Sequence, residues 1–190
     1  MSRDTEQLVL DQFTGTAAGD LATLQACTHP EFVNREAADE PPACAQLGVP
    51  GIWATSAWLR SAFDLRIDPI EIQTRGDRVM AHVWMRGTQH GPFVVFPQRA
   101  RPTAFPPTGR AFEVRQLHTF GVRDGLLVEH QAVRDDLGMM TQLGHLPPSP
   151  AALLRMARYT LSGQAGRAVK RAIEIAEHAA REAQPQPSRA

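Results

Sequence analysis

Residues 115–144 read RQLHTFGVRDGLLVEHQAVRDDLGMMTQLG, and this stretch decides the fold. Apolar residues lie on both sides of Arg123-Asp124-Gly125, a run typical of a tight hairpin turn. We therefore predict a strand over Ala111–Val122 that returns antiparallel over Leu126–Arg134. The apolar residues that follow predict a short helix over Leu137–Leu143.

Upstream of this hairpin the pattern is first helical and then alternating. Helical spacing predicts three helices, the second capped by Asp20: about Asp4–Thr14, Leu21–Cys27 and Gly51–Phe63. From Leu65 the period changes to two, which predicts three strands: Arg66–Thr74, Val79–Gly87 and Phe93–Phe96. A short extended piece is expected at Phe32–Arg35. The proline-rich stretches 37–50 and 97–110 are predicted to be loops.

Downstream, Ser149 and Pro150 form a strong helix start. An apolar stripe predicts a long helix from there to about Ala183, interrupted near Gly163 and Gly166. The chain is thus expected to divide into a domain over 1–148, a C-terminal helical extension over 149–183 and a disordered tail over 184–190. Helices followed by serial strands predict an α+β fold, with a bent antiparallel sheet packed against the N-terminal helices.

The composition of the chain narrows the class of partner. Its 190 residues are 43% apolar and 21% charged, with a net charge of zero. A neutral chain has no long-range attraction for polyanions, so we expect no nucleic-acid partner. No apolar run approaches the roughly 20 residues of a membrane span, and the N-terminus has no signal-peptide pattern. We therefore expect a cytoplasmic protein without a membrane partner.

Two polar residues interrupt an apolar strand face. On the 111–122 strand one face holds Gln116 and His118 among Phe112, Val114 and Phe120. Burying a polar group without a partner costs on the order of 1–3 kcal/mol, so such a pair often marks a pocket wall. A core histidine bonded to a backbone carbonyl would give the same pattern.

The returning strand ends in a dense group of ionisable residues, Glu129, His130, Arg134, Asp135 and Asp136. The hairpin brings this group beside His118, where a carboxylate can orient an imidazole or act as a base. Asp136 is expected to cap the helix that begins at Leu137. Asp135 has the opposite strand parity and is expected to point into the cavity.

The pattern His–strand–DG–EH–D-x-LG-x-x-x-QLG resembles the SnoaL-like polyketide cyclases, also called ester cyclases, of the nuclear transport factor 2-like superfamily. HPEFVNREA (29–37) and GIWATSAWLRSAF (51–63) resemble the same family, so the likeness covers about residues 5–148. It implies a cone of helices against a strongly curved sheet, with a ligand pocket inside. The C-terminal helix is an addition to that fold.

The resemblance also implies a reaction. Family cyclases close a polyketide ring by intramolecular aldol chemistry without a metal or cofactor. The D-x-LG match gives Asp135 the role of base and His118 the assisting role. The pocket wall would include Asn34, Gln116, His130 and Trp58. The chain departs from the family at Gln131, where an aromatic is usual, and at the often polar Ala132. Gln131 is either a new pocket donor or a surface residue.

Three readings follow for function. The first is a cofactor-independent cyclase, or a related lyase or isomerase, acting on a small, largely apolar carbonyl compound. The second is a hydrolase that opens an epoxide or ester with water activated by the aspartate. The third is a non-catalytic binding or dimerisation module. A homo-oligomer is expected. We predict no metal, because His82, His90 and His145 match no ligand spacing.

Overall fold

The computed structural model describes residues 5–184. Its elements, with η for a 3₁₀ helix, are α1 (Thr5–Ala18), α2 (Leu21–Cys27), β1 (Thr28–Asn34), η1 (Arg35–Asp39), η2 (Pro42–Ala45), α3 (Val49–Ala62), β2 (Phe63–Arg75), β3 (Arg78–Gln89), β4 (Phe93–Val95), β5 (Thr103–Phe105), β6 (Ala111–Arg123), β7 (Leu126–Arg134), α4 (Asp136–Gln142), α5 (Pro150–Leu161) and α6 (Gln164–Glu182). The expected α+β fold is confirmed, and all but the first residue of the predicted tail 184–190 lies outside the described residues.

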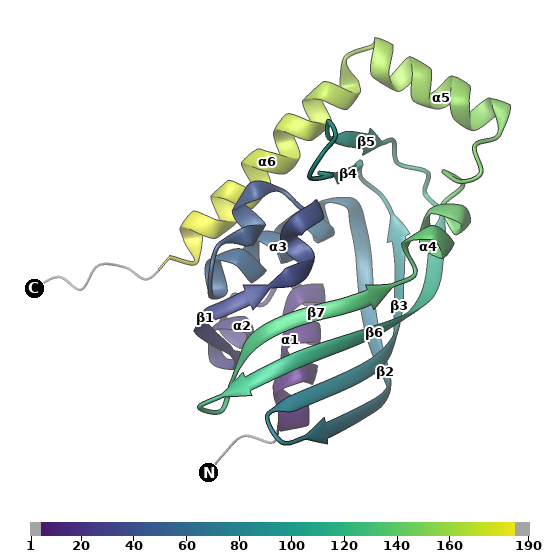
Figure 1. Cartoon of the computed structure of the whole chain (residues 1–190). Coiled ribbons are helices and arrows are strands. Elements are labelled where there is room, and N and C mark those ends of the chain that lie inside the picture. Colours follow the sequence, from purple (N-terminus) through teal and green to yellow (C-terminus); the bar gives the residue numbers. More distant parts are fainter. Residues whose placement is uncertain (1–4, 185–190) are drawn as a thin grey trace, which may run out of the picture.

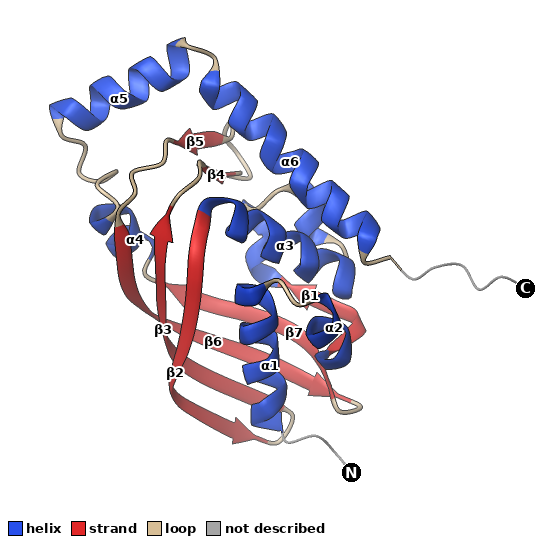
Figure 2. Cartoon of the chain, turned by 180° about the vertical axis from the view of Figure 1, so that it is seen from behind, coloured by secondary structure: helices blue, strands red, loops and turns tan. Residues whose placement is uncertain are grey.

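The main sheet has five strands in the order β1-β7-β6-β3-β2. Its strands curve around α1, and α2 and α3 lie on the same inner side (Figures 1 and 2). Strands β2, β3, β6 and β7 are antiparallel as expected, but β1 runs parallel to β7. Helix α3 and the four strands β2 to β5 separate β1 from β6 and β7 in the chain, so no hairpin constrains the direction of β1.

The β6–β7 hairpin turns at Asp124 and Gly125, whose φ angles are both positive, at 54° and 74°. Positive φ at both central residues is the backbone of a type I′ turn, which matches the twist of the two strands. The register is not regular, however. Val122 pairs with Leu127 while Gly121 pairs with Glu129, so β7 carries one extra residue, Val128. Such a bulge switches the faces of all residues beyond it.

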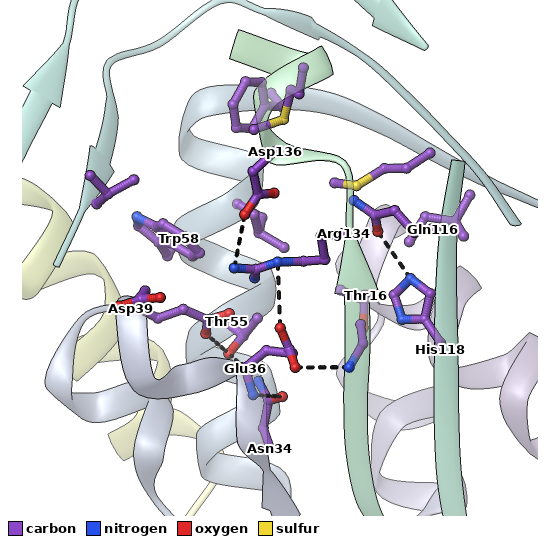
Figure 3. A pocket seen from close by; sticks show the side chains of 18 of the residues that line it. Thr16, Asn34, Glu36, Asp39, Thr55, Trp58, Gln116, His118, Arg134 and Asp136 are labelled. Carbon is purple, nitrogen blue, oxygen red and sulfur yellow. Dashed lines mark hydrogen bonds and ion pairs between the residues drawn. The ribbon is translucent and has the colours of Figure 1, made fainter. Parts of the chain in front are cut away.

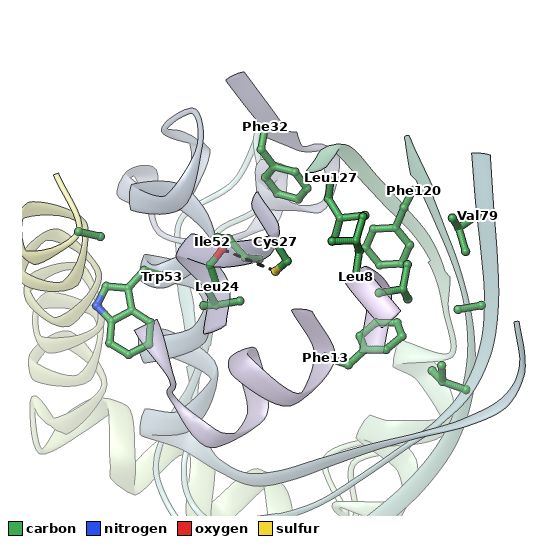
Figure 4. Close-up of a cluster of buried hydrophobic side chains, with 14 of the residues drawn as sticks. Leu8, Phe13, Leu24, Cys27, Phe32, Ile52, Trp53, Val79, Phe120 and Leu127 are labelled. Atoms are coloured by element: carbon green, nitrogen blue, oxygen red, sulfur yellow. Dashed lines mark hydrogen bonds between the residues drawn. The ribbon is translucent and has the colours of Figure 1, made fainter. Parts of the chain in front are cut away.

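Apolar residues of the sheet and the helices form the core between them. Phe120 and Val79 from the sheet and Leu8 and Phe13 from α1 are buried, as Figure 4 shows. Alternation on β6 is as predicted: the side chains at 112, 114, 116, 118 and 120 are buried. Helix α1 covers only part of the concave face, because a cavity lies beside it.

The predicted C-terminal helix is two helices. The break comes at Gly163, whose φ of +72° is left-handed and ends the first helix. Helix α6 packs on α3 through small residues such as Ala176, and Trp53 Nε1 donates to Glu182 Oε2 at 3.1 Å. Helix α5 extends from the body in Figure 1 and exposes Leu154 and Leu161.

The two predicted loops contain short ordered segments. Within 97–110, β5 pairs with β4 as a separate two-stranded sheet, and η1 and η2 occupy much of 35–45. Runs of three to five residues leave no periodic signal that a sequence could show. No helix among residues 5–184 is long and apolar enough to cross a membrane.

Candidate active site

A cavity of about 400 Å³ lies beside α1, between the concave face of the sheet and helix α3. Most of its wall is apolar. Trp58 belongs to this wall, with its ring 5.6 Å from that of Phe93 and its Nε1 donating to the carbonyl of Val94 at 3.2 Å. Other apolar lining residues are Phe13, Phe63, Met85, Met139 and Met140. The polar groups gather where β1, β6 and β7 meet (Figure 3).

Four of these groups form one chain of hydrogen bonds. Gln116 Oε1 lies 3.0 Å from Nε2 of His118, whose Nδ1 lies 2.8 Å from Nε2 of His130. Nδ1 of His130 lies 3.0 Å from Oδ1 of Asn34. Gln116 and His118 meet because residues two apart on β6 face the same side of the sheet. His130 and Asn34 meet because they are paired in the parallel strands β7 and β1.

Both imidazoles of this chain are neutral at neutral pH. Burial lowers the pKa of His118 from 6.5 to about 4, helped by the charge of Arg134. Burial, then His118 and Arg134, lowers the pKa of His130 well below its usual value. A neutral pair can satisfy Asn34 Oδ1 only if His130 donates to it and accepts from His118. Nε2 of His118 then carries no proton and must accept a hydrogen bond. The side-chain amide of Gln116 must therefore be turned by half a rotation, so that its nitrogen and not its oxygen faces His118.

The chain continues from Asn34 to a buried carboxyl group. Asn34 Nδ2 donates to Thr55 Oγ1 at 3.4 Å, and Thr55 Oγ1 donates to Glu40 Oε2 at 2.5 Å. Glu40 is 6% exposed and lines the cavity. Desolvation raises its pKa from 4.5 to about 7, against the lowering effects of the Thr55 hydrogen bond and of Arg134. Both protonation states are therefore populated near neutral pH.

A second polar group surrounds Arg134 on β7. Its guanidinium lies 3.4 Å from a carboxylate oxygen of Glu36 and 3.1 Å from one of Asp136 (Figure 3). Glu36 also accepts the backbone N–H of Ala132 at 2.8 Å. Both carboxylates are therefore already engaged by a cation of the protein.

One donor of the cavity has no hydrogen-bond partner among the described residues. Gln12 on α1 is 3% exposed and lines the cavity, and its Nε2 makes no hydrogen bond with any described residue. An unsatisfied buried donor costs roughly 1–3 kcal/mol. An acceptor oxygen on a bound molecule would remove that cost.

Comparison with known proteins identifies the family. The profile of the SnoaL-like polyketide cyclase family matches residues 7–143. This chain belongs to the SnoaL-like polyketide cyclases. It is 30% identical over 124 residues to the aklanonic acid methyl ester cyclase DnrD of Streptomyces peucetius, which covers 64% of this chain and 78% of the relative. The nogalonic acid methyl ester cyclase of Streptomyces nogalater is 28% identical over 123 residues, or 61% and 79% of the two chains.

A solved structure shares the fold. TsrD from Streptomyces laurentii is 29% identical, with a TM-score of 0.60 over 74% of this chain and 95% of that one. The resemblance stated from the sequence is thus confirmed, together with its cyclase fold. The match to the family ends at residue 143, before α5 begins.

Two residues of this family member are not where the sequence predicted them. The expectation that Asp135 points into the cavity is wrong: it is exposed, and its carboxylate caps α4 by accepting the Gly138 N–H at 2.7 Å. Asp136, the expected cap, lines the cavity instead. Gln131 is exposed and does not line the cavity, so it is the surface residue of the two alternatives.

The bulge at Val128 is the reason for both errors. In a regular hairpin with this turn, odd-numbered β7 residues would face the same side as His118. The bulge pairs His118 with Ala132, so His130, Ala132 and Arg134 face the cavity and Gln131 faces away. The chain reaches Asp136 on the same side two residues after Arg134.

The remaining predicted residues do meet at the cavity. Asn34, Trp58, Gln116, His118 and His130 all line it. Among residues 5–184, His, Cys, Asp and Glu side chains form no group of three that could hold a metal ion.

Sequence reasoning missed the cavity roles of Gln12, Glu36, Glu40 and Thr55. Thr55 interrupts the apolar face of α3, which was a usable signal. Glu40 lies in a stretch with no periodicity, and nothing in the sequence distinguishes it from a solvated loop residue.

Proposed function

We propose that this cyclase closes a carbocyclic ring in a neutral polyketide ester by intramolecular aldol addition inside the cavity. The supporting observation is the cavity itself, which joins an apolar wall to a chain of neutral hydrogen-bonding groups. Two relatives that are 30% and 28% identical over the aligned residues are named as methyl ester cyclases. Enclosure brings the two reacting ends of a flexible substrate together, which can contribute several kcal/mol.

The reaction needs a base, an oxyanion donor and exclusion of water. A proton leaves the carbon beside one carbonyl, the enolate carbon adds to a second carbonyl, and the new alkoxide is protonated. The side-chain amide of Gln116 makes one hydrogen bond, to Nε2 of His118. This bond orients the amide and leaves its second N–H and its oxygen for the substrate. We assign His118 this assisting role. Gln12 Nε2, which has no partner within residues 5–184, would bind another substrate oxygen.

Charge in the cavity favours an ester over a free acid. Four carboxyl side chains line it, those of Glu36, Asp39, Glu40 and Asp136. The one arginine among the described residues of the lining, Arg134, is already paired with Glu36 and Asp136. A substrate carboxylate would add a further negative charge to this wall. We expect the free acid to be used at least about tenfold less well than its methyl ester in kcat/KM, measured with both forms side by side.

A matched pair of glutamine variants tests the site. Gln116→Leu removes an amide that faces the cavity, whereas Gln131→Leu makes the same change on the outer face of the sheet. We expect Gln116→Leu to lower kcat about a hundredfold, as for loss of an oxyanion donor, and Gln131→Leu to keep full activity. The assay follows a polyketide methyl ester by liquid chromatography and mass spectrometry. Equal loss in both variants would contradict the assignment.

Gln12→Leu tests the unpartnered donor separately. The variant removes a buried polar group that costs free energy in the empty protein, so its thermal unfolding midpoint should not fall. We expect KM to rise about tenfold, because the substrate oxygen loses its donor. An unchanged KM would show that Gln12 does not contact the substrate.

A further inference from the structure

The cavity holds four carboxyl side chains whose surroundings differ. Asp39 is exposed, and Glu36 and Asp136 are held by Arg134. Glu40 is buried, and among residues 5–184 no arginine, lysine or histidine lies within ion-pair distance of it. It is thus the carboxyl group of the cavity that is buried and, among the described residues, makes no ion-pair contact.

Every hydrogen bond in the chain that ends at Glu40 is donated in the direction of Glu40. With both imidazoles neutral, donors run from Gln116 through His118, His130, Asn34 and Thr55 to the carboxylate of Glu40. Each donor in such a chain polarises the next. The chain therefore orients the carboxyl group and supports negative charge on it without neutralising that charge.

We propose that Glu40 is the general base of the ring closure, the group that takes the proton from carbon. This inference rests on the proposed function. In the first step the C–H bond beside a substrate carbonyl breaks, its electron pair moves to the enolate, and the proton forms an O–H bond on Glu40. In the second step the enolate carbon bonds to the second carbonyl carbon, and the resulting alkoxide takes the proton back from Glu40. No oxidant or other reactant is consumed, and the ester remains.

The titration of Glu40 suits this cycle. A base that must accept and then return a proton works best with a pKa near the working pH, and burial raises the pKa of Glu40 to about 7. The groups that face it are the Thr55 hydroxyl and the Arg134 guanidinium, which lower its pKa, Glu36, which raises it, and the Cys44 thiol. Burial holds the pKa of Cys44 well above its usual range, so the thiol stays protonated.

The first test compares Glu40→Gln with Glu71→Gln, an exposed glutamate on β2. Purified proteins are incubated in D₂O with a polyketide methyl ester. Ring closure and deuterium uptake at the carbon beside the carbonyl are followed by NMR. We expect Glu40→Gln to lose at least about a hundredfold in both rates and Glu71→Gln to match the unsubstituted protein. Wild-type rates in Glu40→Gln would overturn the proposal.

The second test keeps Glu40 and removes its donor. Thr55→Val preserves the side-chain shape but deletes the hydroxyl that lowers the pKa of Glu40. In the unsubstituted protein kcat/KM should fall as the pH drops through about 7, and the midpoint in Thr55→Val should lie at a higher pH. A purely structural role would lower the rate without moving the midpoint. A midpoint that stays in place would overturn the proposal, even if Glu40→Gln fails to fold.

Failure of the proposed function has a different outcome. If the unsubstituted protein closes no ring and exchanges no carbon-bound proton, the cyclase assignment fails and the role of Glu40 fails with it. If the unsubstituted protein is active and Glu40→Gln is equally active, only the role of Glu40 fails.

Discussion

At the residue scale, two adjacent aspartates have different roles. The carboxylate of Asp135 satisfies a backbone N–H at the start of α4, whereas that of Asp136 faces Arg134 and the cavity. Both belong to the same run of charged residues and differ by one position. Their roles are set by the bulge in β7 and not by local composition.

This division predicts different effects of two substitutions at position 135. Asparagine is as good an N-cap as aspartate, so Asp135→Asn should change neither stability nor turnover appreciably. Asp135→Ala should lower the free energy of unfolding by about 1 kcal/mol, since the N-terminus of α4 loses its acceptor. Urea denaturation and steady-state kinetics check both. Loss of turnover in Asp135→Asn would restore this residue as a catalytic candidate.

At the element scale, α6 and α5 make opposite contributions. Helix α6 buries Ala172, Ala176 and Ala180 close to α3 and the η2 segment, which leaves no room for larger side chains. Helix α5 buries little beyond Ala152. The division at residue 148 stays a prediction, and α6 packs closely on α3.

The contrast predicts the effect of one substitution in each helix. Ala176→Leu should destabilise the protein by roughly 1–3 kcal/mol through overpacking against α3. Leu161→Ala, at a side chain that is 87% exposed, should change stability by less than about 0.5 kcal/mol. Thermal unfolding of both variants measures the difference. Equal effects would show that α6 is not packed as described.

The predictable parts of the fold are those with a repeated pattern. Alternation on β6, the Asp124-Gly125 turn and the helix caps at Asp20 and Ser149 all have local physical causes that a sequence displays. The bulge at Val128 has no such cause, because its register depends on packing across the sheet. The position of Glu40 depends on the path of a nonperiodic segment, and this also left no local signal.

At the scale of the whole molecule, ionisation links stability to pH. His118 and His145 are buried and neutral, with pKa values lowered from 6.5 to about 4, and the pKa of His130 is lowered in the same direction. Glu40 acts in the opposite sense, because its pKa is raised to about 7. Homo-oligomer formation and a cytoplasmic location stay predictions from the sequence.

The histidines predict a loss of stability in acid. Well above pH 6.5 they are neutral in both the folded and the unfolded chain. As the pH falls toward 4, the unfolded chain binds protons that the folded protein does not, so His118 removes up to roughly 3 kcal/mol, and His130 and His145 act in the same direction. Protonation of Glu40 offsets part of this, since it favours the folded state as the pH falls from 7 to 4.5. Because three histidines oppose one carboxyl group, urea denaturation should show a loss of stability that begins at about pH 7 and continues to pH 4.

Variants separate the two contributions. Glu40→Gln should make the loss of stability between pH 7 and pH 4.5 steeper, because a side chain that does not titrate no longer takes up the proton that offsets the histidines. Stability that increases steadily from pH 7 to pH 4.5 would contradict the neutral state of the buried histidines.

The central claim is that the cavity closes a ring without adding atoms to the substrate. Its most direct test is the mass and carbon framework of the product formed from a neutral polyketide methyl ester in ¹⁸O-labelled water. The account predicts a product of unchanged mass, with a new carbon–carbon bond visible by NMR and no ¹⁸O from solvent in the ester. A product that gains one labelled water, or a bound substrate that remains unchanged on long incubation, would contradict it.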